Sequence, residues 1–149
     1  MGFVEQEERK VGKVFDDGSH AIVGAFIEVH RHLGPGLLES AYDACLAREF
    51  SVRQIPFERR VSVPVVYKGI GVATAYQLDF LVAGRFVVEL KAVTQVLPIH
   101  VAQVLTYMKL MNVEVGFLVN FNETVLRRGL RRLSLRDYAE HSSGLPPDP

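Results

Sequence analysis

The sequence predicts an α/β fold in one domain, with two helices followed by a set of β-strands. Three observations support this prediction. Apolar residues recur at helical spacing in two segments, residues 19–33 and 37–50. Segments rich in β-branched residues then follow between residues 59 and 92. A third helical segment beginning at Pro98 precedes the apolar run VEVGFLVNF at residues 113–121, so a helix separates two strands in the second half.

The first two helices are separated by Gly34-Pro35-Gly36, residues that interrupt a helix. The apolar stripe of the first helix consists of Ile22, Val23, Phe26 and Ile27. The apolar stripe of the second consists of Leu37, Leu38, Ala41, Cys45 and Leu46. Residues 51–56 then lead into the first strand.

Three strands are expected before the third helix. The first, residues 59–67, contains Pro64, which favours an edge strand or an irregular point because proline cannot donate to a sheet ladder. The second and third, residues 72–82 and 86–92, form a hairpin through Ala83-Gly84-Arg85.

The second half is predicted to contain a helix from Pro98 and a buried strand at residues 113–121. The pattern of residues 124–138 is ambiguous between strand and helix. The element order is therefore α-α-β-β-β-α-β with an ambiguous C-terminal element. One domain, residues 1–149, is expected, with its core at about residues 19–139 and frayed termini.

The composition excludes several classes of protein. Lys+Arg and Asp+Glu both number 17, so any nucleic-acid partner requires a local basic patch. A single cysteine, Cys45, excludes an intramolecular disulfide and a cysteine-rich zinc site. Neither a signal-peptide run nor a membrane-spanning apolar stretch is present, and we expect a cytoplasmic protein with no membrane partner.

The predicted hairpin brings two acidic residues together. With a three-residue loop, Val82 pairs with Phe86, and the same register places Asp79 opposite Glu89. Like charges that face each other in an antiparallel pair are destabilising. A purely structural sheet would avoid this arrangement.

A third ionisable group lies on the same surface. Because side chains alternate along a strand, Lys91 shares a face with Glu89, whereas Leu90 points to the apolar side. Two adjacent carboxylates require a shared proton or a cation such as Mg²⁺ or Mn²⁺. In the alternative interpretation a two-residue turn shifts the register, and Lys91 simply neutralises Glu89.

Asp79 followed by Glu89-Leu90-Lys91 resembles the signature of the PD-(D/E)xK nuclease superfamily, although Leu78 replaces the usual proline before the first acidic residue. The segment GLLESAY at residues 36–42 matches the pattern of the GxxExxY protein family. The blocks LGPGLLESAY, VVELKAV and LPIHVAQVLTYMK are similar to those of that family, in the same order. The resemblance covers about residues 21–121.

This resemblance implies a restriction-endonuclease-like core with a mixed β-sheet flanked by helices. It also implies a nuclease that uses Mg²⁺ or Mn²⁺ to cleave a phosphodiester bond of DNA or RNA. In the family pattern Asp79, Glu89 and the backbone carbonyl of Leu90 hold the metal, and Lys91 lies beside the attacking water. Small members of the superfamily often pair, which leaves a homodimer open.

Four further residues enter through the resemblance. Glu39, with Tyr42 three residues later, is similar to the acidic helical position of the superfamily; the alternative is an acid that favours a helix start. Gln103 and Tyr107 form a QxxxY pair similar to the RecB-type branch, where such a pair orients the site and the nucleic acid. His30 also matches a family block and is a secondary candidate for the metal.

Two other functions remain open from the sequence. A catalytically inactive member of the same fold would bind nucleic acid or a protein partner without cleavage. A structural protein would use the charged hairpin only as a salt bridge. An arginine-rich run at residues 126–136, LRRGLRRLSLR, could contact phosphates or form a solvated face.

Overall fold

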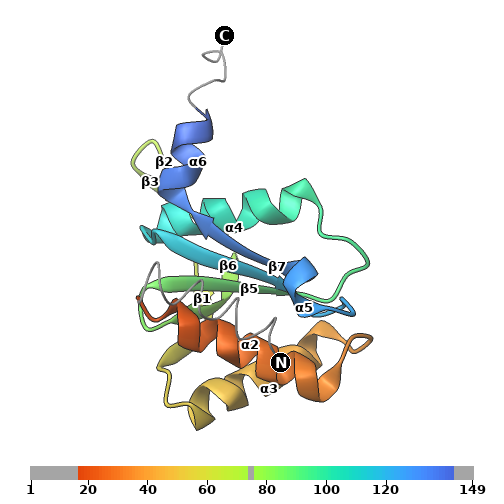
Figure 1. The fold of residues 1–149 in the computed structure, drawn as a ribbon. Coiled ribbons are helices and arrows are strands. Elements are labelled where there is room, and N and C mark those ends of the chain that lie inside the picture. Colours follow the sequence, from red (N-terminus) through yellow and green to blue (C-terminus); the bar gives the residue numbers. More distant parts are fainter. Residues whose placement is uncertain (1–16, 74–75, 143–149) are drawn as a thin grey trace.

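The protein forms three layers, with a β-sheet between helices on both of its faces (Figure 1). The computed structural model describes residues 17–73 and 76–142. Helices α2 (Ser19–Leu33) and α3 (Glu39–Val52) cover one face of the sheet. Helix α4 (Pro98–Met111) covers the other. This arrangement confirms the predicted α/β class.

The central sheet is mixed. Its strands are β1 (Phe57–Ser62), β4 (Gln77–Val82), β5 (Phe86–Lys91), β6 (Val115–Asn120) and β7 (Leu130–Ser134). Their order is β1-β4-β5-β6-β7. Strands β5 and β6 are parallel and are connected through α4, whereas the other neighbouring pairs are antiparallel. A mixed sheet flanked by helices is the core that the sequence predicted.

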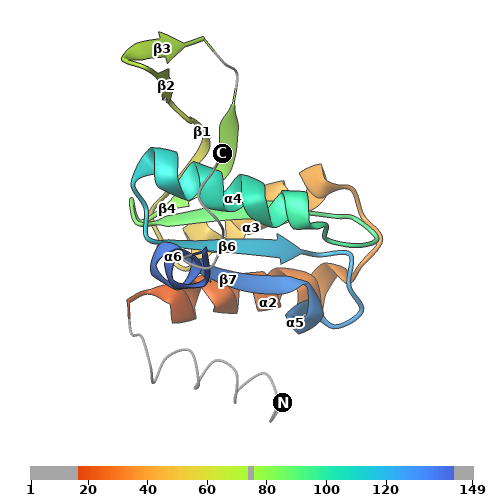
Figure 2. The same cartoon turned by 90° about the horizontal axis from the view of Figure 1, so that it is seen from above.

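A separate hairpin, β2 (Val65–Tyr67) and β3 (Ile70–Val72), lies between β1 and β4 in the chain. It projects away from the three layers (Figure 2). The strand expected at residues 59–67 is divided between β1 and β2, because the chain leaves the sheet at residues 63–64, where Pro64 has no N–H to donate. As Pro64 indicated, this is an irregular point, and β1 lies at the edge of the sheet. The expected strand at residues 72–82 is likewise divided between β3 and β4, and its residues 74–75 lie outside the described part.

The ambiguous segment at residues 124–138 contains both kinds of structure. Helix α5 (Leu126–Gly129) is followed by β7 and then by α6 (Leu135–Ser142). The prediction of frayed termini falls mainly on residues 1–16 and 143–149, outside the described residues. Within the described ranges, no helix has both the length and the apolar character needed to cross a bilayer.

The start of the second helix differs from the prediction. Leu37 and Leu38, assigned to its apolar stripe, precede α3 and are exposed, and Leu38 has an extended backbone. The helix therefore begins at Glu39, which places that carboxylate in the first turn.

Two apolar clusters, one on each face, hold the layers together. The cluster beneath α2 and α3 contains Phe26, Phe50, Phe80 and Phe117, whose rings contact one another in edge-to-face pairs. The cluster beneath α4 contains Val87, Met108 and Leu118. Leu90 belongs to the first cluster and Val87 to the second, so alternation along β5 directs Glu89 and Lys91 toward the α4 side.

Candidate functional site

The hairpin of β4 and β5 has the predicted register. Phe80 pairs with Val88, Leu81 with Val87 and Val82 with Phe86, which leaves residues 83–85 as the loop. Both Ala83 (φ 53°) and Gly84 (φ 65°) have left-handed backbones. The same register places Asp79 opposite Glu89. The alternative of a shifted register is therefore wrong.

The sheet ladder is interrupted at Asp79. Asp79 is not among the residues of β4 that pair with β1 or β5, although the neighbouring pairs place Arg60 and Glu89 beside it. Leu78 and Phe80 would share a face in a regular strand, yet they pack in the clusters on opposite faces. This local irregularity frees the backbone N–H of Asp79 from the ladder.

Side-chain hydrogen bonds replace the missing ladder bonds. The backbone N–H of Asp79 donates to Glu89 Oε1 at 2.7 Å. The backbone N–H of Leu90 donates to Asp79 Oδ2 at 2.9 Å. Each carboxylate thus accepts, through one oxygen, a hydrogen bond from a backbone N–H of the neighbouring strand, and the two acidic groups are held side by side.

Burial makes this pair difficult to ionise fully. Only 4% of Glu89 is exposed, and burial, followed by the charge of Asp79, raises the pKa of Glu89 to about 8. Burial also raises the pKa of Asp79, although the hydrogen bond from the Leu90 N–H acts in the opposite direction. Near neutral pH the metal-free pair is therefore expected to retain one proton.

The donor set fits a hard divalent cation. Both carboxylates supply oxygen ligands, and Mg²⁺ is commonly bound through one or two carboxylates with waters and substrate phosphates completing its shell. A cation would remove the repulsion that now favours the shared proton. Among the described residues there is no group of three or more His, Cys, Asp or Glu side chains placed to hold a metal ion. The structure thus does not bring His30 or Glu39 into one ligand group with Asp79 and Glu89.

Lys91 is placed where its ammonium group can act on all the acidic residues of the site. It is the last residue of β5 and is partly buried. Its positive charge lowers the pKa of Asp79, of Glu89 and of Glu39, against the larger effect of burial on each. The ammonium group of Lys91 therefore acts electrostatically on three carboxyl groups, one each from β4, β5 and α3.

Helix α3 contributes two acidic residues, one of which sequence reasoning missed. Glu39, in the first turn, lies at the surface, and its pKa is raised by partial burial and by the charges of Asp79 and Asp43, which outweigh the opposing charge of Lys91. Asp43, one turn later, also raises the pKa of Asp79 and forms an ion pair with Arg59 of β1. The i, i+4 spacing of the two acids is the signal that could have identified Asp43.

Tyr42 holds the loop that leads into α3. Its side chain is completely buried, its hydroxyl donates to the Gly34 carbonyl at 2.6 Å, and it accepts from the Leu37 N–H at 3.2 Å. Its ring stacks on Phe121 with a centroid distance of 4.7 Å and an interplanar angle of 8°. Because it is buried, Tyr42 can orient Glu39 but cannot contact a substrate directly.

Helix α4 faces the carboxylates with the predicted QxxxY pair. The side-chain amide of Gln103 donates to the Tyr107 hydroxyl at 3.0 Å. Burial raises the pKa of Tyr107, and the negative charge of Glu89 raises it further. Tyr107 therefore lies in the electrostatic field of the carboxylate pair, on the side of the sheet to which Glu89 points.

His30 has a different environment. Its Nε2 donates to the backbone carbonyl of Glu123 at 2.6 Å, and its ring stacks on Phe121. These contacts link α2 to the chain that follows β6. A role of His30 at the metal stays a prediction, and its ring nitrogen Nε2 is already engaged.

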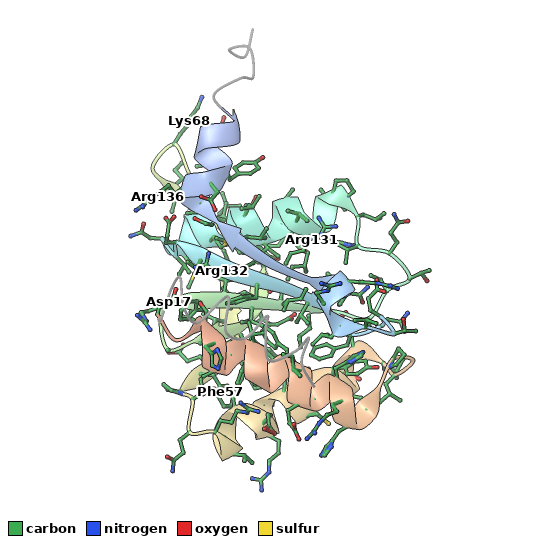
Figure 3. The ribbon with its side chains drawn as sticks, viewed as in Figure 1. Asp17, Phe57, Lys68, Arg131, Arg132 and Arg136 are labelled. Carbon is green, nitrogen blue, oxygen red and sulfur yellow. The ribbon has the colours of Figure 1, made fainter. Side chains whose placement is uncertain are left out.

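The arginine-rich run does not form one continuous surface. Arg131 and Arg132 are adjacent on β7, so their side chains point to opposite faces of the sheet (Figure 3). Arg132 reaches Asp17 at 3.5 Å on the α2 side. The run as a whole therefore cannot contact a single phosphate backbone from one face.

Comparison with protein families gives one match. The family model described as the PD-(D/E)XK nuclease superfamily matches residues 16–133, a range that includes every candidate site residue. No curated protein and no solved structure matches the chain.

Proposed function

Because the chain belongs to the PD-(D/E)XK nuclease superfamily, we propose that it is a metal-dependent nuclease that hydrolyses phosphodiester bonds of DNA or RNA. The observation that carries this proposal is the pair formed by Asp79 and Glu89, two buried carboxyl groups fixed side by side by backbone N–H groups. Burying two carboxyl groups together destabilises the folded protein, and a function in binding a divalent cation would explain why the pair is there.

Asp79, Glu89 and the backbone carbonyl of Leu90 would hold Mg²⁺ or Mn²⁺. Glu39 and His30, the other metal candidates, do not form one ligand group with this pair in the described part of the chain. A bound divalent cation supplies a lower pKa for water and stabilisation of negative charge on a phosphate. To hold a cation both carboxyl groups would have to be ionised, so the proton that burial keeps on the pair would be released on binding.

Lys91 is the residue of the chain that would supply a positive charge at the proposed reaction site. Its positive charge acts on Asp79, Glu89 and Glu39, and its ammonium group could donate hydrogen bonds to the attacking water and to a phosphate oxygen, whose negative charge increases in the transition state. Gln103 and Tyr107 lie on the α4 side of the same pair and can orient the nucleic acid, since both carry hydrogen-bond donors.

The finer assignment rests on the sequence blocks. We propose that the chain is a GxxExxY protein related to the RecB-type branch, on the basis of the segment at residues 36–42 and of Gln103 and Tyr107. We also propose a cytoplasmic location and a homodimer, the two expectations given in the sequence analysis. Glu39 takes the role of the helical acid, held at the start of α3 by the loop that Tyr42 fixes.

The proposal is tested by incubating the purified protein with single-stranded DNA, duplex DNA and RNA in Mg²⁺, Mn²⁺ or EDTA. We expect cleavage of at least one substrate with Mg²⁺ or Mn²⁺ and none with EDTA. Replacing Asp79 by asparagine removes one metal-binding charge, so Asp79→Asn is expected to lower the cleavage rate by about 10³-fold or more.

Glu58→Gln is the matched control, because Glu58 is an exposed acidic residue on the neighbouring strand β1. It should cleave at the wild-type rate. Equal cleavage by the wild type and Asp79→Asn would attribute the activity to a contaminant, and the proposal would then be wrong.

A further inference from the structure

The end of β6 carries a buried polar residue that the proposed chemistry does not use. Asn120 lies opposite Lys91 in the parallel pair of β5 and β6 and is completely buried. A buried side-chain amide is costly unless its donors and acceptor are hydrogen bonded. The hydrogen-bond partners of the Asn120 amide therefore indicate the role of this side chain.

Asn120 binds the chain just beyond Lys91. Its Nδ2 donates to the Val93 carbonyl at 2.9 Å, and its Oδ1 accepts from the Val93 N–H at 3.1 Å. The backbone N–H of Phe121 also donates to the Lys91 carbonyl at 2.9 Å. β5 ends at Lys91, but these three bonds keep the following residues attached to β6.

Two residues later, Asn122 binds the loop that precedes Glu39. Its Oδ1 accepts from the backbone N–H of Gly36 at 3.1 Å. The backbone N–H of Asn122 in turn donates to Asn120 Oδ1 at 3.2 Å, so the two amides belong to one network. Gly36 (φ +101°) requires the left-handed conformation that glycine tolerates.

Phe121, between the two asparagines, reinforces the same connection. Its ring stacks on Tyr42, whose hydroxyl is bonded to the carbonyl of Gly34 and the N–H of Leu37. The loop before α3 is therefore held by Tyr42 at Gly34 and Leu37 and by Asn122 at Gly36. At the other end of the network α5 packs closely on β6, because a Cβ at Gly129 would lie 2.4 Å from the Asn120 carbonyl oxygen.

We propose that Asn120 and Asn122 are positioning residues, which together fix Lys91 on β5 relative to Glu39 on α3. This inference rests on the proposed nuclease function. Lys91 and Glu39 lie on elements from opposite ends of the site, and residues 120–122 bind the backbone next to both. A catalytic arrangement depends on geometry to within about 0.5 Å, and this network is the connection that sets it.

The test uses Asn122, whose side chain is only partly buried, so that its replacement leaves the core intact. In Asn122→Ala the Gly36 N–H loses its acceptor, and Glu39 is no longer held relative to Lys91. We expect kcat to fall about 10-fold to 10²-fold, while the KM for the oligonucleotide and the midpoint of Mn²⁺-induced thermal stabilisation stay within about twofold.

Asn122→Asp keeps an oxygen acceptor for the Gly36 N–H but loses the Nδ2 that donates to the Val93 carbonyl at 3.4 Å, so it is expected to recover only part of kcat. Thr124→Ala, an exposed replacement two residues later, is the matched control and should behave as the wild type. A readout independent of turnover is the NMR shift of the Gly36 amide proton, which should move upfield in Asn122→Ala and stay near its wild-type value in Asn122→Asp.

The outcomes separate this inference from the proposed function. Metal-dependent cleavage by the wild type with an unchanged kcat in Asn122→Ala would overturn the inference alone. A lower kcat accompanied by an equal rise in KM would also overturn it, because the residue would then act in binding. If the wild type shows no metal-dependent cleavage, the proposed function fails and the inference fails with it.

Discussion

Replacing Lys91 by alanine is expected to lower the rate of metal-dependent cleavage by about 10² to 10³-fold, the effect of removing one group that stabilises developing negative charge. The same variant should retain or slightly strengthen its affinity for Mn²⁺. The reason is that the Lys91 ammonium group now lies near Asp79 and Glu89, and it repels a cation that approaches them. Single-turnover cleavage and thermal stabilisation by Mn²⁺ measure the two effects separately.

Two comparisons make this result specific. Lys68→Ala removes an exposed lysine on the β2–β3 hairpin, where the ammonium lies 5.4 Å from the centroid of the Tyr67 ring, and should leave the rate unchanged. Lys91→Arg keeps the charge with a larger, planar group and should recover only part of the rate. Full activity in Lys91→Ala would show that the lysine has no part in the chemistry.

The stability of the metal-free protein should fall as the pH rises from about 5 to 8. The pKa of Glu89 is about 8 in the folded protein, against an ordinary value of 4.5. Between these two values the folded state holds a proton that the unfolded state has lost, so each pH unit reduces the free energy of unfolding by up to about 1.4 kcal/mol. Urea unfolding in EDTA at several pH values measures this slope.

Glu89→Gln isolates the contribution of this carboxyl group, because the amide does not titrate. The variant should show a flatter pH dependence and, at pH 8, a higher free energy of unfolding than the metal-free wild type. Saturating Mn²⁺ should stabilise the wild type at pH 8 and leave Glu89→Gln nearly unchanged. Identical slopes in the two proteins would mean that Glu89 is ionised throughout, against the geometry of the pair.

The register of the hairpin formed by β4 and β5 could be predicted because it depends on local information. A three-residue loop between two strands fixes which residues face each other, and the pairs from Phe80–Val88 to Val82–Phe86 follow from it. The interruption of the sheet ladder at Asp79 could not be predicted from this register. That irregularity arises from packing, since Leu78 is buried beneath α4 whereas Phe80 is buried beneath α3.

Residues that act across long distances in sequence were the ones missed. Asn120 and Asn122 bind Val93 and Gly36, 27 and 86 residues away, and no local pattern predicts such partners. A polar residue at the end of the apolar strand VGFLVN is nevertheless a visible signal. Arg59 was missed for a similar reason, because its ion pair with Asp43 joins β1 to α3. The β2–β3 hairpin was missed because the break at Pro64 was read as an irregularity within one strand.

A crystal structure of the protein grown with Mn²⁺, with anomalous diffraction data, tests the central claim most directly. We expect one anomalous peak between Asp79 and Glu89, at about 2.0–2.3 Å from a carboxylate oxygen of each. At saturating Mn²⁺, the absence of an anomalous peak between two carboxyl groups that keep their bonds to the Asp79 and Leu90 N–H groups would contradict it.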